Sequence, residues 1–276
     1  MRRCFRTEQR HKDASVDIAA SRTLLRNAMK QSKACIFIGQ GFIGGAPDGT
    51  TTTLGREGSD YSAAVAANIL DAESMSVWKD VDGILNADPK VFPDAVQIAE
   101  LNYLDTIELA YSGAQIIHPK TIKPLQNKNI PLYVRPFGDK RKPGTVIRRM
   151  SAPIEVPILI LKKDQVLLTI RSRDFSFVLE EKFAAIFSLL ERYRIKVNLV
   201  HNSAVNLSLC VDNSWHIDEA IQALRNEEFD VMKVENMELL TIRGYNGDLM
   251  ERYASGPEVF LLQRTQSTAR IVRKNR

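Results

Sequence analysis

The chain has 276 residues, of which 44% are hydrophobic and 26% charged, as in a water-soluble globular protein with one large or two ordinary domains. No apolar run approaches the roughly 18 residues of a membrane-spanning helix, and the basic start leads into no apolar signal core. The formal net charge of +5 comes from residues 2–12 and 270–276, which contribute about +4 each and leave a slightly acidic body. Membrane insertion, secretion and a nucleic-acid-binding surface are therefore disfavoured.

The three cysteines, Cys4, Cys35 and Cys210, lie far apart and lack the spacing of a metal site. Cys35 and Cys210 stand in apolar runs, which predicts buried free thiols. Free thiols are typical of a reducing compartment, so the sequence predicts a cytoplasmic protein.

The first half of the chain alternates helical and strand-like patterns. Apolar spacing predicts a helix over 16–30, and the apolar run at 34–39 predicts a strand buried on both faces. Ser59 or Asp60 is expected to cap an alanine-rich helix, which a second buried strand at 75–80 follows.

Two further helices, near 102–112 and 119–128, precede a strand at 131–135. This alternation predicts a mostly parallel α/β sheet, in which ligands bind beyond the carboxyl ends of the strands. The loops at 40–58 and 79–93 are expected to leave strands at that edge.

The stretch at 138–157 carries glycine, prolines and charge, and it is the predicted domain boundary. Beyond it the elements change to a β-α-β-β-α-β order, which indicates a ferredoxin-like module followed by a shorter partner. The near-identical strands "LLTIRS" (167–172) and "LLTIRG" (239–244) suggest an internal duplication. The expected strands and helices are 165–172, 180–193, 197–202, 204–212, 216–226, 238–245, 247–254 and 258–265.

Two loops carry the candidate chemistry. In "GTTTTLGREGSDYSAA" (49–64), glycines allow close backbone approach, threonine hydroxyls add donors, and Arg56 offers a planar fork for a carboxylate or phosphate. In "KDVDGILNADPK" (79–90), three aspartates stand at uneven spacing that does not fit an EF-hand. Composition alone leaves each open as an ordinary surface loop or a ligand-handling one.

Four sequence blocks resemble those of a known enzyme family. "GFIG…GTTTTLGREGSDYSAA" (41–64), "VWKDVDGILNADPK" (77–90), "IELAYSGAQIIHPKTIKPL" (107–125) and "IPLYVRPF" (130–137) resemble aspartokinase in order and approximate spacing. Tandem regulatory ACT modules follow, as in that family. The resemblance implies a three-layer amino-acid-kinase sheet, incomplete at its N-terminal side, with ferredoxin-like α+β ACT modules. It also implies transfer of the γ-phosphoryl group of ATP to the β-carboxylate of L-aspartate, which opens lysine, threonine and methionine synthesis.

The resemblance also implies residue roles on the acceptor side. Arg56 would pair with a carboxylate of aspartate, with Thr53 and Ser59 nearby. Asp60 would orient a lysine that stabilises charge on the phosphates, so Asp60 and Arg56 are the expected catalytic residues.

On the nucleotide side, the resemblance places Lys79 and Asp80 by the nucleoside and Lys90 at the phosphates, with Lys120 nearby. Phosphoryl transfer relies on lysines, Mg²⁺ and N–H donors more than on a covalent nucleophile, so ATP and Mg²⁺ are the expected cofactors. No residue is assigned as a metal ligand.

The sequence departs from the family pattern in three places. The lysine- and glycine-rich "KFGG" signature, which supplies the principal phosphate lysine, occurs nowhere in the chain. Glu57 stands where many members have glycine, and its carboxylate would repel an anionic substrate unless paired. Gln115 stands where many members carry a lysine.

In the regulatory part, residues 172–178 and 196–203 match the effector region of the family's first ACT module. The candidates for binding an amino acid such as lysine or threonine are Asn198, Asn202 and Ser203; the alternative is that they only complete a strand edge. His118 and His201 are expected to be structural.

The sequence predicts an unassigned segment at 1–15, a kinase domain at 16–150 and tandem ACT modules at 151–276, with homodimerisation through those modules. A truncated, non-catalytic amino-acid sensor is the alternative function. A kinase of the same fold with another acceptor is disfavoured by the "GREGSD" block and the ACT tail.

Overall fold

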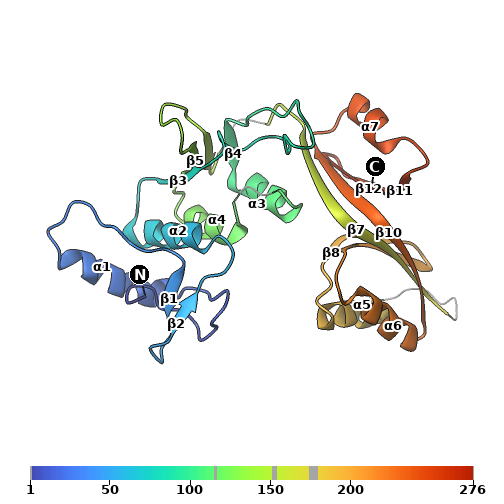
Figure 1. Ribbon diagram of the computed structural model, residues 1–276, viewed down its shortest axis with the longest axis horizontal. Helices are drawn as coiled ribbons and strands as arrows, with labels where there is room; N and C mark the ends of the chain where they lie inside the picture. Colours follow the sequence, from blue (N-terminus) through green and yellow to red (C-terminus); the bar gives the residue numbers. More distant parts are fainter. Residues whose placement is uncertain (1, 115–116, 151–153, 174–179, 276) are drawn as a thin grey trace. The chain divides into compact units, whose positions relative to one another are not determined.

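The computed structural model describes residues 2–114, 117–150, 154–173 and 180–275. The chain divides into two compact units, Met1–Glu155 and Val156–Arg276 (Figure 1). No helix in the described ranges is both long and apolar enough to cross a membrane.

The first unit contains two small sheets and four helices within its described residues. Its elements are α1 (Ile18–Lys30), β1 (Ile43–Gly45), β2 (Thr51–Thr53), α2 (Gly58–Leu70), β3 (Met75–Lys79), β4 (Glu100–Asn102), α3 (Tyr103–Tyr111), α4 (Pro119–Gln126), β5 (Leu132–Pro136) and β6 (Thr145–Arg148). All four predicted helices are confirmed, as are the strands at 75–80 and 131–135.

The segment before α1 is part of this unit. Phe5 is fully buried in one apolar cluster with Leu54, Tyr61 and Val65, and backbone hydrogen bonds tie the segment to β1 and β2. Asp17 then caps α1, because its side chain accepts a hydrogen bond from the N–H of Ala20 (3.0 Å).

The four-stranded sheet has the order β3-β5-β6-β4. β3 pairs with β5 and β4 with β6 in parallel, whereas β5 and β6 are antiparallel, so the sheet is mixed and two of its three pairings are parallel, as the sequence predicts. β3 is also only half buried: Met75 and Val77 face the core, whereas Ser76 and Trp78 are exposed. β3 is also an edge strand of the sheet, so one of its two sides has no strand partner for its N–H and C=O groups.

The predicted buried strand at 34–39 is wrong. The segment has no regular secondary structure, and Ile36 and Ile38 are 81% and 99% exposed. A strand needs a partner for its N–H and C=O groups, and no described strand pairs with this run. Cys35 is consequently exposed rather than buried.

The loop at 40–58 therefore does not leave a strand; it contains the antiparallel hairpin of β1 and β2. Neither Ser59 nor Asp60 caps α2. Glu57 is the N-cap residue, in a left-handed conformation (φ 52°), and Asp60 lies in the first turn. A carboxylate in the first turn is favoured by the helix dipole.

The second unit is a six-stranded antiparallel sheet with three helices in its described residues, in the order β11-β12-β10-β7-β9-β8. Its elements are β7 (Ile158–Ser172), α5 (Glu180–Arg192), β8 (Val197–Asn202), β9 (Asn206–Asp212), α6 (Ile217–Asn226), β10 (Phe229–Arg243), α7 (Gly247–Ala254), β11 (Val259–Arg264) and β12 (Thr268–Lys274). The predicted β-α-β-β-α-β order is confirmed, and β12 was missed.

The repeated sequence lies in the two long central strands (Figure 1). β7 and β10 pair antiparallel over their length, with a register shift on each side of Met237. Residues 167–171 of β7 also pair with β9, and residues 239–243 of β10 also pair with β12. Each copy of the repeat thus occupies an equivalent central position. The helices α5 and α6 cover one face through the cluster that includes Leu168, Ile186 and Leu224.

Candidate functional site

The two candidate loops meet through an ion pair. Asp60, in the first turn of α2, and Lys79, at the end of β3, place Oδ2 and Nζ 2.8 Å apart. Their side chains are 19% and 29% exposed, so the pair is partly shielded from water. The lysine that Asp60 orients in this structure is therefore Lys79, which the sequence reasoning had placed only near the nucleoside.

Arg56 lies in the turn directly before α2 and is exposed. No described residue forms an ion pair or hydrogen bond with its guanidinium, so its fork of donors remains available to an anion. Ser59 is exposed one turn further on, beside Gly41. Thr53 is half-buried, and its hydroxyl donates a hydrogen bond to the carbonyl of His11 (3.0 Å).

The carboxylate of Glu57 is hydrogen-bonded to the N-terminus of another helix, which stabilises its charge there. Its Oε2 accepts a hydrogen bond from the backbone N–H of His118 (2.7 Å), the N-cap residue of α4. Nδ1 of His118 in turn accepts from the N–H of Lys120 (3.2 Å), which is a structural role for this histidine. The negative charge of Glu57 is thus directed at a helix N-terminus, where it is stabilised.

Lys120 is held by the N-terminal segment. Its Nζ lies 2.5 Å from Oδ1 of Asp13 and 5.7 Å from the centre of the Tyr61 ring. The hydrogen bond from Lys120 lowers the pKa of Asp13. In this structure the charge of Lys120 is therefore balanced by a carboxylate that the sequence reasoning had left unassigned.

The second loop is a folded element rather than a solvated turn. The hydroxyl of Thr145 accepts from the N–H of Ile84 (2.8 Å) and donates to the carbonyl of Ile98 (2.6 Å). Asn86 and Val96 are joined by hydrogen bonds in both directions. Asp80 and Lys90 are exposed on this loop, and no contact in the described part of the chain joins either of them to Asp60 or Arg56.

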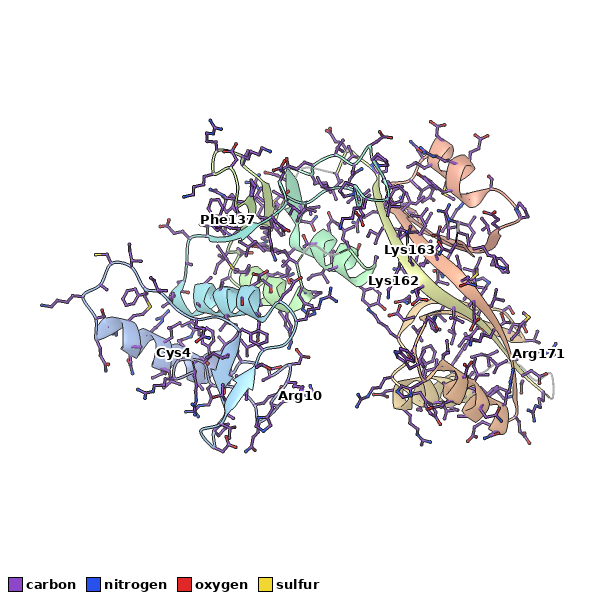
Figure 2. All side chains as sticks on the ribbon, in the orientation of Figure 1. Cys4, Arg10, Phe137, Lys162, Lys163 and Arg171 are labelled. Carbon is purple, nitrogen blue, oxygen red and sulfur yellow. The ribbon has the colours of Figure 1, made fainter. Side chains whose placement is uncertain are left out.

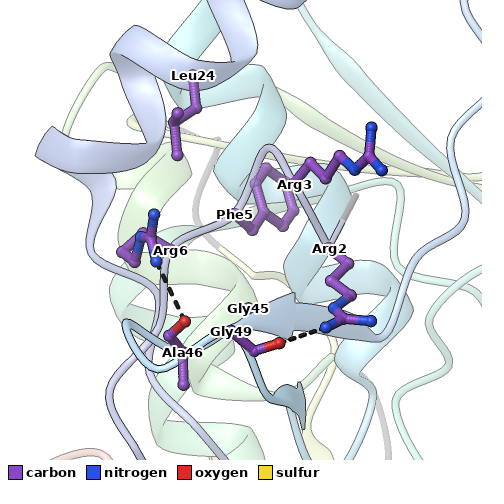
Figure 3. Close-up of a pocket in the computed structure, with 8 residues that line it drawn as sticks. All are labelled: Arg2, Arg3, Phe5, Arg6, Leu24, Gly45, Ala46 and Gly49. Atoms are coloured by element: carbon purple, nitrogen blue, oxygen red, sulfur yellow. Dashed lines mark hydrogen bonds between the residues drawn. The ribbon is translucent and has the colours of Figure 1, made fainter.

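Two of the cavities in the described part of the first unit border the candidate loop at 40–64. One, of about 580 Å³, is bounded by α1, residues 37–41 and α2, and Ser59 lies on its wall beside mostly apolar side chains. The other, of about 370 Å³, is lined by Arg2, Arg3 and Arg6 (Figure 3). Arg2 and Arg6 there donate to the carbonyls of Gly49 and Ala46, which fastens the N-terminal segment to the β1–β2 hairpin.

The described residues contain no group of three or more histidine, cysteine, aspartate or glutamate side chains that could hold a metal ion. Asp60 is paired with Lys79, and Asp82 is paired with Lys142 (2.6 Å). The donor set therefore does not fit a metal cage built by the protein alone.

Asn198 belongs to a polar network in the second unit. Its side chain donates to Gln165 and Asp212 (2.7 Å each) and accepts from Lys162 (2.8 Å), which lies on β7 (Figure 2). Burial acts to raise the pKa of Asp212, but the hydrogen bonds from Lys162, Gln165 and Asn198 hold it below its usual range. The full hydrogen-bonding of Asn198 favours a structural role.

Asn202 ends the edge strand β8, and Ser203 follows it. Asn202 is exposed, and Ser203 closes the turn to β9, because its N–H donates to the carbonyl of Asn206 (2.9 Å). The predicted effector residues are thus not joined in one cluster. Gln115 and most of the effector loop at 172–178 lie outside the described residues.

The sequence indicates the candidate residues, but it does not indicate the residues that bind them. Asp13, His118 as a backbone donor, Gln165 and Asp212 are separated by tens of residues from the groups they bind. The available signal was weak: a glutamine opening the apolar run at 165 and an aspartate closing the one at 212.

Residues 4–136 match the model of the amino acid kinase family. The chain is 34% identical over 269 residues to lysine-sensitive aspartokinase 3 of Escherichia coli, covering 94% of this chain and 59% of that relative. It is 36% identical to the chloroplastic aspartokinase 1 of Arabidopsis thaliana, covering 71% of this chain and 36% of that one. The chain thus spans 59% and 36% of the length of these two relatives.

Solved structures agree. Escherichia coli aspartokinase III in complex with aspartate and ADP superposes with a TM-score of 0.79 at 29% identity, covering 99% of this chain and 65% of that one. The same enzyme in complex with lysine and aspartate gives 0.75 at 30% identity, covering 98% and 64%. Aspartate kinase from Clostridium acetobutylicum, 18% identical, gives 0.82 and supports the fold alone. The fold class predicted from the sequence is confirmed.

Proposed function

This chain belongs to the aspartokinase family, and on that premise we propose that it takes part in phosphorylating the β-carboxylate of L-aspartate with ATP. The observation that carries the proposal is the ion pair of Asp60 and Lys79, since it joins the two loops that resemble the acceptor and nucleotide loops of the family. One structure of that Escherichia coli relative is a complex with aspartate and ADP.

The reaction requires groups that stabilise the negative charge of the phosphates, and it requires no nucleophile from the protein. An oxygen of the β-carboxylate attacks the γ-phosphorus, the bond from that phosphorus to the β,γ-bridging oxygen breaks, and ADP leaves with 4-phospho-L-aspartate as the other product. We propose that Arg56 holds a carboxylate of aspartate, with Ser59 and Thr53 beside it. Lys79, oriented by Asp60, would balance the charge of the phosphates.

Asp80 is proposed at the nucleoside, and Lys90 and Lys120 at the phosphates. Lys120 has three N–H donors, of which two go to Asp13, so a phosphate oxygen would take the third or displace Asp13. Mg²⁺ keeps several waters and binds substrate phosphates in many kinases. We propose that it arrives with the nucleotide, since the described residues form no cage for it.

We propose that the kinase domain spans residues 16–150 together with the N-terminal segment that packs into the same unit, and that residues 151–276 form its ACT regulatory region. An amino acid bound there, with lysine or threonine as the candidates, would bias the kinase unit between two states. Homodimerisation through the sheet edges of this region and a cytoplasmic location remain predictions.

The alternative, an amino-acid sensor without catalysis, is favoured by two observations. Lys120 is paired with Asp13, and no contact among the described residues joins Asp80 or Lys90 to Asp60 or Arg56. Both leave the nucleotide side of the site with fewer groups than the resemblance implies.

The deciding experiment is a coupled assay for ADP formation by the purified chain with Mg²⁺, with and without L-aspartate. Lys79→Met should lower aspartate-dependent turnover about 100-fold, the scale for loss of one group that stabilises transition-state charge. Lys142→Met, which breaks the exposed pair with Asp82 in the same unit, is the matched control and should leave turnover unchanged. Absence of turnover, together with a rise in melting temperature on adding lysine or threonine, would establish the sensor instead.

A further inference from the structure

Glu57 has a strained backbone conformation, and the contacts of its side chain help to maintain it. With φ 52° and ψ 31°, it occupies the left-handed region, which disfavours residues with a Cβ. It stands between Arg56 and Gly58, at the start of α2. A strained residue of this kind persists only where its surroundings hold it in place.

The surroundings that hold Glu57 are at the N-terminus of α4. Its carboxylate receives the N–H of His118 at 2.7 Å, a charge-assisted bond across 61 residues of sequence. Helices α2 and α4 are joined again near the C-terminal end of α2, where the side chain of Asn68 donates to the carbonyl of Pro124 (2.8 Å). The turn that carries Arg56 is thus tied to a packed helix.

On its other side, the same turn is tied to the sheet by Asp60 and Lys79. The N–H of Gly58 also donates to the carbonyl of Gly55 (3.0 Å), and that of Tyr61 to the carbonyl of Glu57 (3.0 Å). Arg56 is exposed within this frame, so its backbone is fixed while its guanidinium is free to meet an anion.

We propose that Glu57 is a positioning residue: its bond to the His118 N–H locks the turn in the conformation that presents Arg56 to the carboxylate of the acceptor. The inference deepens the proposed function and rests on it for the identity of the acceptor, L-aspartate. In this proposal Glu57 acts through Arg56 and not by binding the substrate, because its carboxylate is hydrogen-bonded at the N-terminus of α4.

The test uses the full chain and compares Glu57→Ala with Glu57→Gln. Hydrogen exchange of the His118 amide, followed by NMR without substrate, should be about tenfold faster in Glu57→Ala. In Glu57→Gln it should stay near the wild-type rate, because the amide oxygen still accepts the bond. In the turnover assay, KM for aspartate should rise about tenfold in Glu57→Ala with a smaller change in kcat, since the lost effect is on binding.

Glu228→Ala is the matched control. Glu228 also has a left-handed backbone (φ 65°) and is exposed in the second unit, so the same substitution meets the same strain without the tether. It should change neither the His118 exchange nor KM. Unchanged exchange in Glu57→Ala, or an unchanged KM despite faster exchange, would overturn the positioning role. A wild-type chain without aspartate-dependent turnover would instead overturn the proposed function, while the exchange comparison would still decide whether the tether exists.

Discussion

Asp60 and Lys79 show how a residue acquires its role from a distant partner. They are 19 positions apart, and each stands in a loop whose composition fits an ordinary surface turn. Only the packing of α2 near β3 brings the carboxylate and the ammonium within 2.8 Å. Because both side chains keep some contact with water, the pair adds modestly to stability. Its importance is in fixing where the positive charge lies.

The cysteines Cys35 and Cys210 are expected to differ in reactivity. Burial raises the pKa of the Cys210 thiol to about 12, whereas Cys35 is exposed. In a Cys4→Ser background, an aromatic disulfide reagent at pH 8 should titrate one thiol in the folded chain and two in denaturant. Raising the pH from 8 to 10 should leave Cys210 unreactive, because the thiolate is the nucleophile and its fraction stays small. Rapid labelling of Cys210 in the folded chain would contradict its burial.

At the scale of elements, the structure of the run at 34–39 differs from the one that its composition predicts. Six apolar or small residues in a row predict a buried strand, yet the side chains of Ile36 and Ile38 face water. Burial of each would contribute about 1.5–3 kcal/mol, but a strand also requires a neighbour for its backbone. Whether an apolar run forms a buried strand therefore depends on a neighbouring strand as well as on its own composition.

Ile38→Ser measures this directly. Since Ile38 is 99% exposed, the substitution should change the free energy of unfolding by no more than about 0.5 kcal/mol in urea titration. Ile69→Ala, at a fully buried site of α2 in the same unit, should cost about 2–5 kcal/mol. A loss of several kcal/mol on Ile38→Ser would mean that the run is buried in solution.

At the scale of the whole molecule, the chain forms two units with separate cores. The boundary lies between Glu155 and Val156, within the glycine-, proline- and charge-rich stretch at 138–157. β7 and β10 pair along their full length inside the second unit, so both halves of the repeat share one sheet. A sheet of this kind has the hydrogen bonds and the apolar core to be stable alone.

Residues 156–276, expressed without the first unit, should therefore fold. Far-ultraviolet circular dichroism should show mixed helix and strand with a cooperative thermal transition. Leu168→Ala, at a fully buried position of β7, should weaken that transition by about 2–5 kcal/mol. A fragment without cooperative melting would show that the second unit depends on the first.

The sequence by itself determined the helices, most strands, the order of elements in the second unit and the residues of the candidate loops. These depend on local periodicity, turn residues and motif order, which a linear chain displays. The tertiary structure alone decided that 34–39 is unpaired, that Asp60 binds Lys79, that Glu57 caps α4 through His118, and that Asn198 belongs to a polar network. Each of these depends on a partner many residues away, and the pairing of distant groups is set by packing rather than by the pattern around either one.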